Sequence, residues 1–303
     1  MREAGGRRPA AVPVLRRAAG PDRPHLPPRQ RVQALSWPWP QAQVLDRLAF
    51  GSLEVVGRLV DASNLALQCL LRDGGTETLV MYKPVRGERE LWDFPDGTLA
   101  NREAAAYAVS AVGGWDLVPP TVLREGPFGE GTVQLWVDPA DQGALIDVVP
   151  RRRLRQGWLP VFDAQTFDGT RVVVAHADRP DLLAAAVFDA VVNNADRKGS
   201  HLVLDGTGGL RGFDHGLTFH ETPKLRTVLW GWAGQPLPAV ELARLECLAG
   251  WLRDDRTALA ATLARLLTRA ELAALRRRVD RLVGAGILPD LPSRRPAVPW
   301  PPL

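Results

Sequence analysis

The sequence predicts an α+β protein of two lobes, in which a small antiparallel β lobe with one helix precedes a mainly helical lobe. In the first part, short apolar segments alternate with turns rich in Gly and Asp, as in a β meander. After Asp138-Pro139 breaks this pattern, apolar residues recur mainly at helical spacing. We expect four segments: a disordered basic leader (1–44), the β lobe (45–138), the helical lobe (139–288) and a Pro-rich tail (289–303) that is extended or disordered.

The β lobe is expected to contain five strands and one helix. Apolar segments bounded by turn residues predict strands at 53–60, 65–71, 79–85, 121–124 and 132–137. A meander of three strands needs something to cover one of its faces. The cover predicted here is a helix that begins near Thr98 and ends before Gly113-Gly114, because Leu99, Ala106 and Val109 recur at helical spacing.

The helical lobe shows clear helix signals. Helices are predicted at 180–192, 240–252, 257–267 and 271–283. Pro180 occupies the first turn of one of them, and Thr268 with Glu271 forms a capping box for another. A short hairpin is expected at 202–204 and 210–213.

The composition excludes several classes of protein. No segment approaches the ~20 consecutive apolar residues of a membrane-spanning helix. Arginine and proline interrupt the first residues, unlike a secretory signal, so we expect a cytoplasmic protein. Cys69 and Cys247 lie in apolar stretches and are expected to be buried free thiols.

The net charge of +4 is concentrated in the leader, where residues 1–44 hold eight arginines and two acidic residues. A basic arm can bind nucleic acid or an acidic membrane surface. A solvated, disordered leader is the simpler interpretation, because such a composition cannot bury a core. The rest of the chain has no basic excess, so we expect no nucleic-acid partner and no stable membrane insertion.

Two charged residues stand out in the β lobe. Lys83 lies in an apolar strand and must send its ammonium to a counter-charge, to an opening or, from an edge, to solvent. Glu103 follows twenty positions later, near the start of the helix that covers the sheet. It can pair with Lys83, or it can be an ordinary favourable carboxylate in a first helical turn.

Two polar segments follow in the helical lobe. Residues 193–201, Asn-Asn-Ala-Asp-Arg-Lys-Gly-Ser-His, connect an apolar helix to a strand and are longer than a simple turn requires. Residues 212–216, Gly-Phe-Asp-His-Gly, present the carboxylate of Asp214 at a strand end. Such a group suits Mg²⁺ held against phosphates, although an aspartate in a Gly turn is also common.

Taken in order, these four segments resemble the motifs of the protein-kinase-like fold, and in detail those of its atypical branch. Asp196-Arg197 begins its loop as in phosphatidylinositol 3- and 4-kinases, and Phe213-Asp214-His215-Gly216-Leu217 is similar to their Ile-Asp-x-Gly-Leu turn. The Asn-Asn-Ala-Asp-Arg-Lys-Gly run resembles an actinobacterial branch of the phosphatidylinositol 3- and 4-kinase-like family. The resemblance covers about residues 45–235.

The resemblance implies an ATP-dependent kinase that uses Mg²⁺ or Mn²⁺, and it assigns roles by position. The residues that it implies for the nucleotide are Ser63 and Asn64 at the phosphates, Lys83 steadied by Glu103 at the α- and β-phosphates, and the backbone of Leu135, Trp136 and Val137 at the adenine. Those that it implies for the reaction are Asp196, which orients the attacking hydroxyl, Arg197 or Lys198, which stabilises the transferred charge, and Asp214, which binds the metal.

One position departs from the family. His201 stands where the family has the Asn that makes the second metal contact, and imidazole is a poorer ligand for Mg²⁺ than for transition metals. Either His201 still binds the metal, or Asn194 replaces it, or the metal site is weakened. The alternatives to a kinase are therefore a nucleotide-binding regulatory pseudokinase, an AMP-transferring enzyme of the same fold, and a structural protein without nucleotide.

The acceptor is left open between a protein, a small molecule and a lipid head group. The segment 215–238 should lie over the acceptor site. It holds Lys224 and Arg226 but no dense basic cluster of the kind that grips a polyphosphoinositide.

Overall fold

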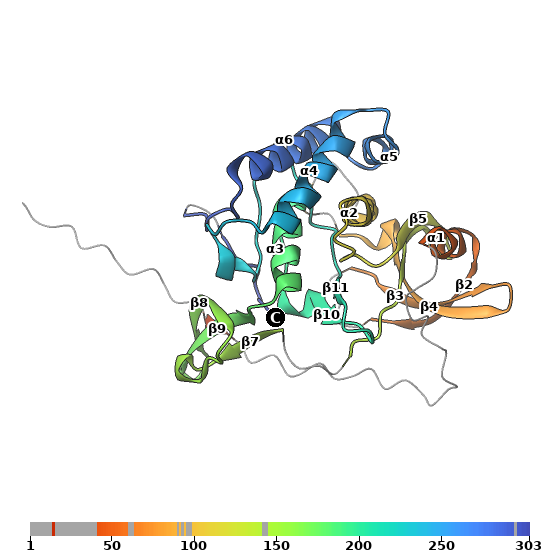
Figure 1. Cartoon of the computed structure of the whole chain (residues 1–303). Coiled ribbons are helices and arrows are strands. Elements are labelled where there is room, and N and C mark those ends of the chain that lie inside the picture. The colour runs from red at the N-terminus through yellow and green to blue at the C-terminus, as the bar shows by residue number, and fades with distance from the viewer. Residues whose placement is uncertain are drawn as a thin grey trace, which may run out of the picture.

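The computed structural model describes residues 14–15, 41–59, 64–89, 91, 94, 99–140, 145–293 and 296–303. It confirms the predicted fold class, an α+β protein with a small antiparallel β lobe and a second, larger lobe rich in helices (Figure 1). Within the described residues, none of the helices combines the length and apolar character needed to cross a membrane.

The β lobe is built on a five-stranded antiparallel sheet. Its strand order is β2-β3-β4-β6-β5, with β2 at Ser52–Arg58, β3 at Leu67–Asp73, β4 at Thr76–Pro84, β5 at Thr121–Gly126 and β6 at Gly129–Leu135. The predicted helix is α2, at Leu99–Val112. A second helix was not predicted: α1, at Gln41–Phe50, packs Val44 and Leu48 into the core of this lobe. The expected leader boundary at residue 44 therefore falls inside a helix.

The larger lobe contains the predicted helices with small shifts at their ends. They are α3 at Pro180–Val192, α4 at Ala239–Arg253, α5 at Ala258–Leu266 and α6 at Arg269–Ala285. The capping box of Thr268 and Glu271 is present at the start of α6. The hairpin consists of β10 at Leu202–Leu204 and β11 at Leu210–Gly212.

A separate sheet interrupts this lobe and was missed. Its strands are β7 at Ile146–Val149, β8 at Trp158–Thr166 and β9 at Arg171–Ala177, and the short β1 at Val14–Leu15 pairs in parallel with β8. Figure 1 shows it beyond α3, on the side away from the β lobe. The description "mainly helical" therefore omits one of the two sheets of this lobe.

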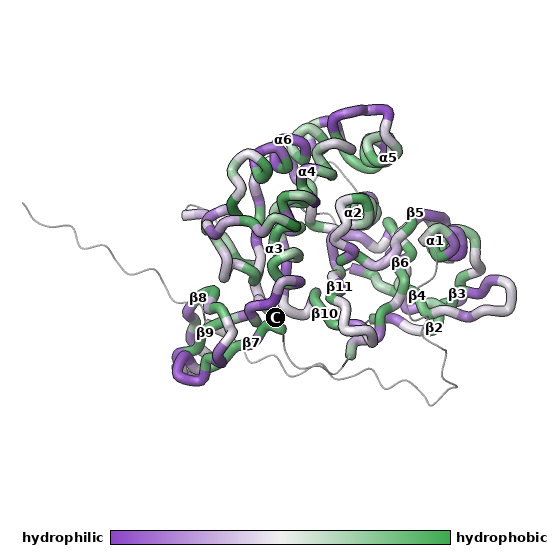
Figure 2. Tube along the Cα trace, in the orientation of Figure 1, coloured by the Kyte–Doolittle hydropathy of each residue, from purple (hydrophilic) through white to green (hydrophobic). Residues whose placement is uncertain are grey.

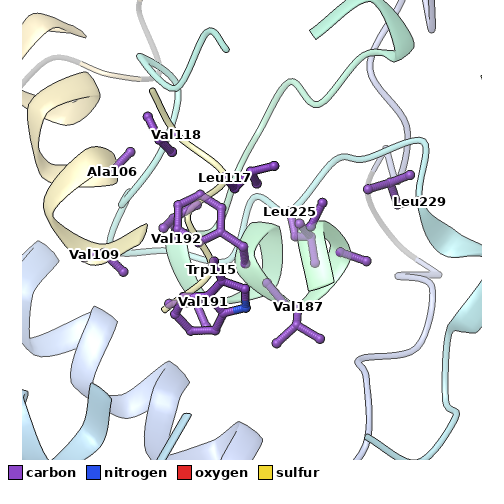
Figure 3. Close-up of a cluster of buried hydrophobic side chains, with 14 of the residues drawn as sticks. Ala106, Val109, Trp115, Leu117, Val118, Val187, Val191, Val192, Leu225 and Leu229 are labelled. Carbon is purple, nitrogen blue, oxygen red and sulfur yellow. The ribbon is translucent and has the colours of Figure 1, made fainter. Parts of the chain in front are cut away.

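The hydrophobic core of the larger lobe also receives helix α2. Ala106 and Val109 of α2 contribute to the same buried cluster as Val187 and Val191 of α3, with Trp115 beside them (Figure 3). Helix α3 is apolar along most of its length in Figure 2, as expected for a helix surrounded by other elements. Helix α2 is thus shared between the sheet and the helical lobe.

The two cysteines differ from each other. Cys69 is buried in β3 as expected, and burial raises the pKa of its thiol to about 11. Cys247 is exposed on α4, so the expectation that it is buried is wrong. Both are free thiols.

Candidate functional site

The site is centred on Lys83, which contacts carboxylates from two other elements. Its Nζ atom lies 2.6 Å from Oε1 of Glu103 on α2 and 3.1 Å from Oδ1 of Asp214 in the turn after β11. The Glu103 side chain is only 4% exposed, whereas that of Asp214 is 56% exposed. Three predicted residues from both lobes therefore meet at one point, and the outermost of them is open to solvent.

These contacts favour the charged forms of Lys83 and Asp214. Burial alone opposes the Lys83 ammonium, but the charges of Asp214 and Glu103 raise the pKa of Lys83 above its ordinary value. Conversely, the Lys83 ammonium holds the pKa of Asp214 well below its usual range. The site therefore presents a fixed cation beside an ionised and accessible carboxylate.

Helix α2 also fixes the backbone around Asp214. The second oxygen of Glu103, Oε2, accepts a hydrogen bond of 3.0 Å from the backbone N–H of His215. Asp214 itself has a positive φ of 57°, a conformation that few residues other than Gly adopt. The Glu103 carboxylate thus stabilises the strained backbone turn at Asp214 from the other lobe.

The loop between α3 and β10 carries Asp196 and Lys198. Their charged groups form an ion pair of 3.1 Å, and both side chains are about four-fifths buried. Burial raises the pKa of Asp196, and the negative charge of Asp214 adds to this effect. Asp196 is therefore near Asp214 in an environment that favours accepting a proton.

Arg197 does not face the solvent-accessible side of the site. Its guanidinium has no exposed surface and makes three contacts of 2.9 to 3.1 Å with the carboxylate of Asp189 on α3. It also donates to the carbonyl of Phe213, the residue before Asp214. The expectation that Arg197 stabilises transferred charge is therefore corrected: it ties the loop to α3 and to the Asp214 turn.

Asp189 was missed by sequence reasoning. In addition to Arg197, it accepts hydrogen bonds from Asn194 Nδ2 at 3.0 Å and from Thr227 Oγ1 at 3.1 Å. The signal was present, because a lone carboxylate inside the apolar run of α3 must be paired if it is buried. Asn194 is fully buried in this network, and its Oδ1 accepts from the Asp196 amide. Asn194 is thus occupied by structural contacts instead of facing Asp214.

The two histidines of the site are held as neutral side chains. His215 has no exposed surface, and its Nε2 lies 2.7 Å from Nη2 of Arg197. A guanidinium can only donate, so Nε2 is the acceptor and the proton is on Nδ1. Burial lowers the pKa of His215 well below its ordinary value.

His201 lies beside Asp214, with its Nε2 3.6 Å from Oδ2. Burial lowers the pKa of His201 to about 4. Within the part of the chain that the structure describes, its Nδ1 has no hydrogen-bond partner. Nε2 of His201 and Oδ2 of Asp214 therefore lie side by side in the site.

The described residues contain no group of three or more His, Cys, Asp or Glu side chains that could hold a metal ion. Asp214 and His201 are only two such side chains. A divalent ion here would need further oxygen ligands from elsewhere, as Mg²⁺ bound with a nucleotide obtains from phosphates.

The segment that joins the lobes follows β6. Leu135 is buried, and the Trp136 amide donates to the carbonyl of Leu79 at 3.1 Å. Among the described residues, no backbone hydrogen bond engages the next amide, that of Val137. Three residues later, the Ala140 amide donates a hydrogen bond to the carbonyl of Leu204 on β10. The connecting segment therefore contacts the larger lobe within a few residues of β6.

The expected phosphate loop is described only in part. Ser63 lies outside the described residues. The Asn64 Oδ1 accepts a hydrogen bond from the Arg89 amide at 3.1 Å, which links the two connections on either side of β3 and β4.

A cavity of about 820 Å³ lies elsewhere, between Trp115 and the first turns of α3 and α4. It shares no lining residue with the Lys83 site. The arginines that line it are already paired with carboxylates: Arg179 with Asp181, Arg211 with Asp205 and Asp116, and Arg244 with Glu241.

Comparison with known proteins identifies a relative. Over 263 residues, the chain is 46% identical to Protein Rv2133c of Mycobacterium tuberculosis, covering 84% of this chain and 93% of that protein. The chain belongs to the family of Protein Rv2133c. No protein-family model matches it. Among solved structures, that of the Helicobacter pylori proinflammatory kinase CtkA matches with a TM-score of 0.37 and 10% identity, over 79% of this chain and 94% of that one.

Proposed function

We propose that this protein is an ATP- and metal-dependent phosphotransferase of the phosphatidylinositol 3- and 4-kinase-like type. One observation carries the proposal: the Lys83 ammonium is 2.6 Å from Glu103 and 3.1 Å from Asp214. Phosphoryl transfer depends on positioning and neutralising charge, for which a lysine steadied by a helix glutamate and a metal-binding aspartate are recurring parts.

Each of the other residues takes a role in this proposal. Lys83 binds the α- and β-phosphates, and Asp214 holds the metal against them. Asp196, with its raised pKa, orients the acceptor hydroxyl and accepts its proton, while Lys198 stabilises the transferred charge. The Val137 amide, which makes no backbone hydrogen bond within the described part of the chain, is a donor for the adenine ring.

A second candidate is a nucleotide-binding protein without turnover. The observation that favours it is His201, an imidazole where the resemblance implies an amide ligand for the second metal contact. Such a protein would bind ATP through Lys83 and Asp214 and would transfer nothing.

The test measures binding and transfer separately. The purified chain is incubated with ATP and either Mg²⁺ or Mn²⁺; thermal stabilisation reports binding, and mass spectrometry of the products reports transfer of phosphate or of AMP. Asp214→Asn is expected to abolish metal-dependent stabilisation, whereas Asp196→Asn is expected to retain it and to remove transfer. Stabilisation without any transfer by the unmodified chain favours the second candidate. If ATP stabilises neither the chain nor its variants, the nucleotide site is wrong.

A further inference from the structure

Residues 296–303, called the strap below, lie against the loop that carries Asp196. The Gly199 amide donates a hydrogen bond of 2.8 Å to the carbonyl of Pro302. Two more donors reach Ala297: the Thr227 amide at 3.1 Å and Trp230 Nε1 at 2.7 Å both bond to its carbonyl. The end marked C in Figure 1 accordingly lies near the end of α3 and β10.

The strap is packed as well as hydrogen-bonded. Pro299 and Pro302 are buried, and Val298 packs against the core of the larger lobe. At Gly199, an added Cβ would lie 2.6 Å from the end of the Leu303 side chain, which shows how closely the strap approaches the loop at this point. The Trp300 side chain is instead 52% exposed.

The composition of the strap suits this role. Its four prolines fix φ, which lowers the conformational entropy that a short segment loses on docking. A proline has no N–H but keeps its carbonyl, and both strap residues that bond to the loop region do so as acceptors.

The loop between α3 and β10, which carries Asp196, is thus held by contacts on three sides. Asp189 of α3 holds Arg197 from one side. Residues 226–228 hold it from the second, because the backbone of Arg197 exchanges hydrogen bonds with Arg226 and Val228. The strap supplies the third support at Gly199, between Lys198 and His201.

We propose that the strap is a positioning segment, which holds residues 196–201 in the geometry needed for transfer without itself touching the nucleotide. Its effect on turnover rests on the proposed function, but its effect on the loop does not. Among the residues that the structure describes, Lys83 and Asp214 pair with each other, with Glu103 and with His201 and make no hydrogen bond or ion pair with the strap, so nucleotide binding is expected to be independent of it.

The first experiment compares the full chain with a variant that lacks residues 296–303. Hydrogen–deuterium exchange followed by NMR is expected to show the Gly199 and Thr227 amides exchanging at least about fivefold faster in the variant, as for the loss of one hydrogen bond each. A synthetic peptide with the strap sequence, added in excess, is expected to restore the slow exchange. Trp300→Ala is the control and should leave both rates unchanged. Equal rates at Gly199 with and without the strap would overturn the proposal.

A milder variant covers the case in which the deletion does not fold. Trp230→Phe keeps an aromatic side chain but removes the Nε1 donor to Ala297 together with part of the buried ring, so the Thr227 amide should again exchange severalfold faster. An unchanged exchange rate of the Thr227 amide in this variant counts against the positioning role of the strap.

Activity gives an independent readout. In the deletion variant, kcat for transfer is expected to fall about tenfold while KM for ATP stays the same, and the peptide should restore kcat. A variant with full kcat despite fast exchange at Gly199 refutes the positioning role. If neither form transfers a group, the proposed function fails, and the exchange rates alone decide whether the strap holds the loop.

Discussion

Glu103 and His215 are joined by a hydrogen bond of 3.0 Å from the His215 amide to the carboxylate oxygen that does not contact Lys83. One carboxylate therefore sets the position of the strand lysine and of the turn that carries Asp214. Its two oxygens serve two lobes, which makes Glu103 the residue on which the geometry of the site depends.

Glu103→Gln tests this dependence. The amide keeps the shape but loses the charge opposite Lys83, so ATP affinity is expected to fall by about 10- to 150-fold, in line with the loss of a charge-assisted hydrogen bond of about 1.5–3 kcal/mol. Isothermal titration with ATP and Mg²⁺ measures it. Glu77→Gln, on the exposed part of the same sheet, is the control and should bind normally. Equal affinity in both variants would remove Glu103 from the site.

Asp189→Asn is expected to destabilise the fold. It leaves the fully buried Arg197 without its counter-charge, which typically costs about 3–5 kcal/mol. Urea denaturation measures the free energy of unfolding. Asp181→Asn on the same helix breaks a more exposed pair with Arg179 and should cost no more than about 1 kcal/mol. Replacing Asp189 with Leu and Arg197 with Met together should recover part of the loss. A small effect of Asp189→Asn alone would contradict the anchoring role of this pair.

His201→Asn is expected to change the metal preference of nucleotide binding. An amide oxygen is a better ligand for Mg²⁺ than imidazole nitrogen, so the ratio of ATP affinity in Mg²⁺ to that in Mn²⁺ should rise severalfold. The shift of Tm with ATP in each metal measures this ratio. The control is His220→Asn, at a histidine that contacts Phe94 and Thr222. An unchanged ratio would show that His201 does not contact the metal.

Stability is expected to fall as the pH drops below about 6.5, the ordinary pKa of histidine. His176 is buried, with its Nε2 accepting from the Gly231 amide at 3.1 Å, and burial lowers its pKa. The unfolded chain thus binds a proton near pH 6.5 that the folded chain does not. The free energy of unfolding therefore decreases as the pH is lowered.

The slope of the free energy of unfolding against pH, determined between pH 7.5 and 5.5, measures this effect. Burial lowers the pKa of His201, His215 and His220 as well, so wild-type Tm should fall throughout this range. His176→Gln removes one such group and should reduce the slope by up to about 1.4 kcal/mol per pH unit. A variant with the wild-type slope would show that His176 is not held neutral.

The sequence predicted what local rules determine. Helix α3 begins and ends where its proline and its apolar run indicate, and the capping box of α6 is formed by the two residues expected. The packing of the helix on the sheet left a pair between Lys83 and Glu103 as one of two alternatives, and the family resemblance implied it. Each of these predictions depends on neighbours in sequence or on a single packing step.

What was missed depends on tertiary contacts. Arg197 follows Asp196, and nothing in the loop indicates that its side chain turns inward to Asp189. The strands β7, β8 and β9 are separated by arginine-rich and Gly-containing connections and were not recognised as one sheet. The tail from residue 289 was expected to be extended or disordered, whereas residues 296–303 dock through carbonyls, which no side-chain pattern reveals.

Helix α2 carries Arg102 immediately before Glu103, and Arg102 forms a buried ion pair of 2.5 Å with Glu271 of α6. Because consecutive helical residues point about 100° apart, Arg102 and Glu103 fix two different faces of α2 to their partners. Any rotation that withdrew Glu103 from Lys83 would drag Arg102 off its partner as well. An outward movement of α2 would therefore cost both ion pairs at once, which makes it an energetically expensive way to open the site.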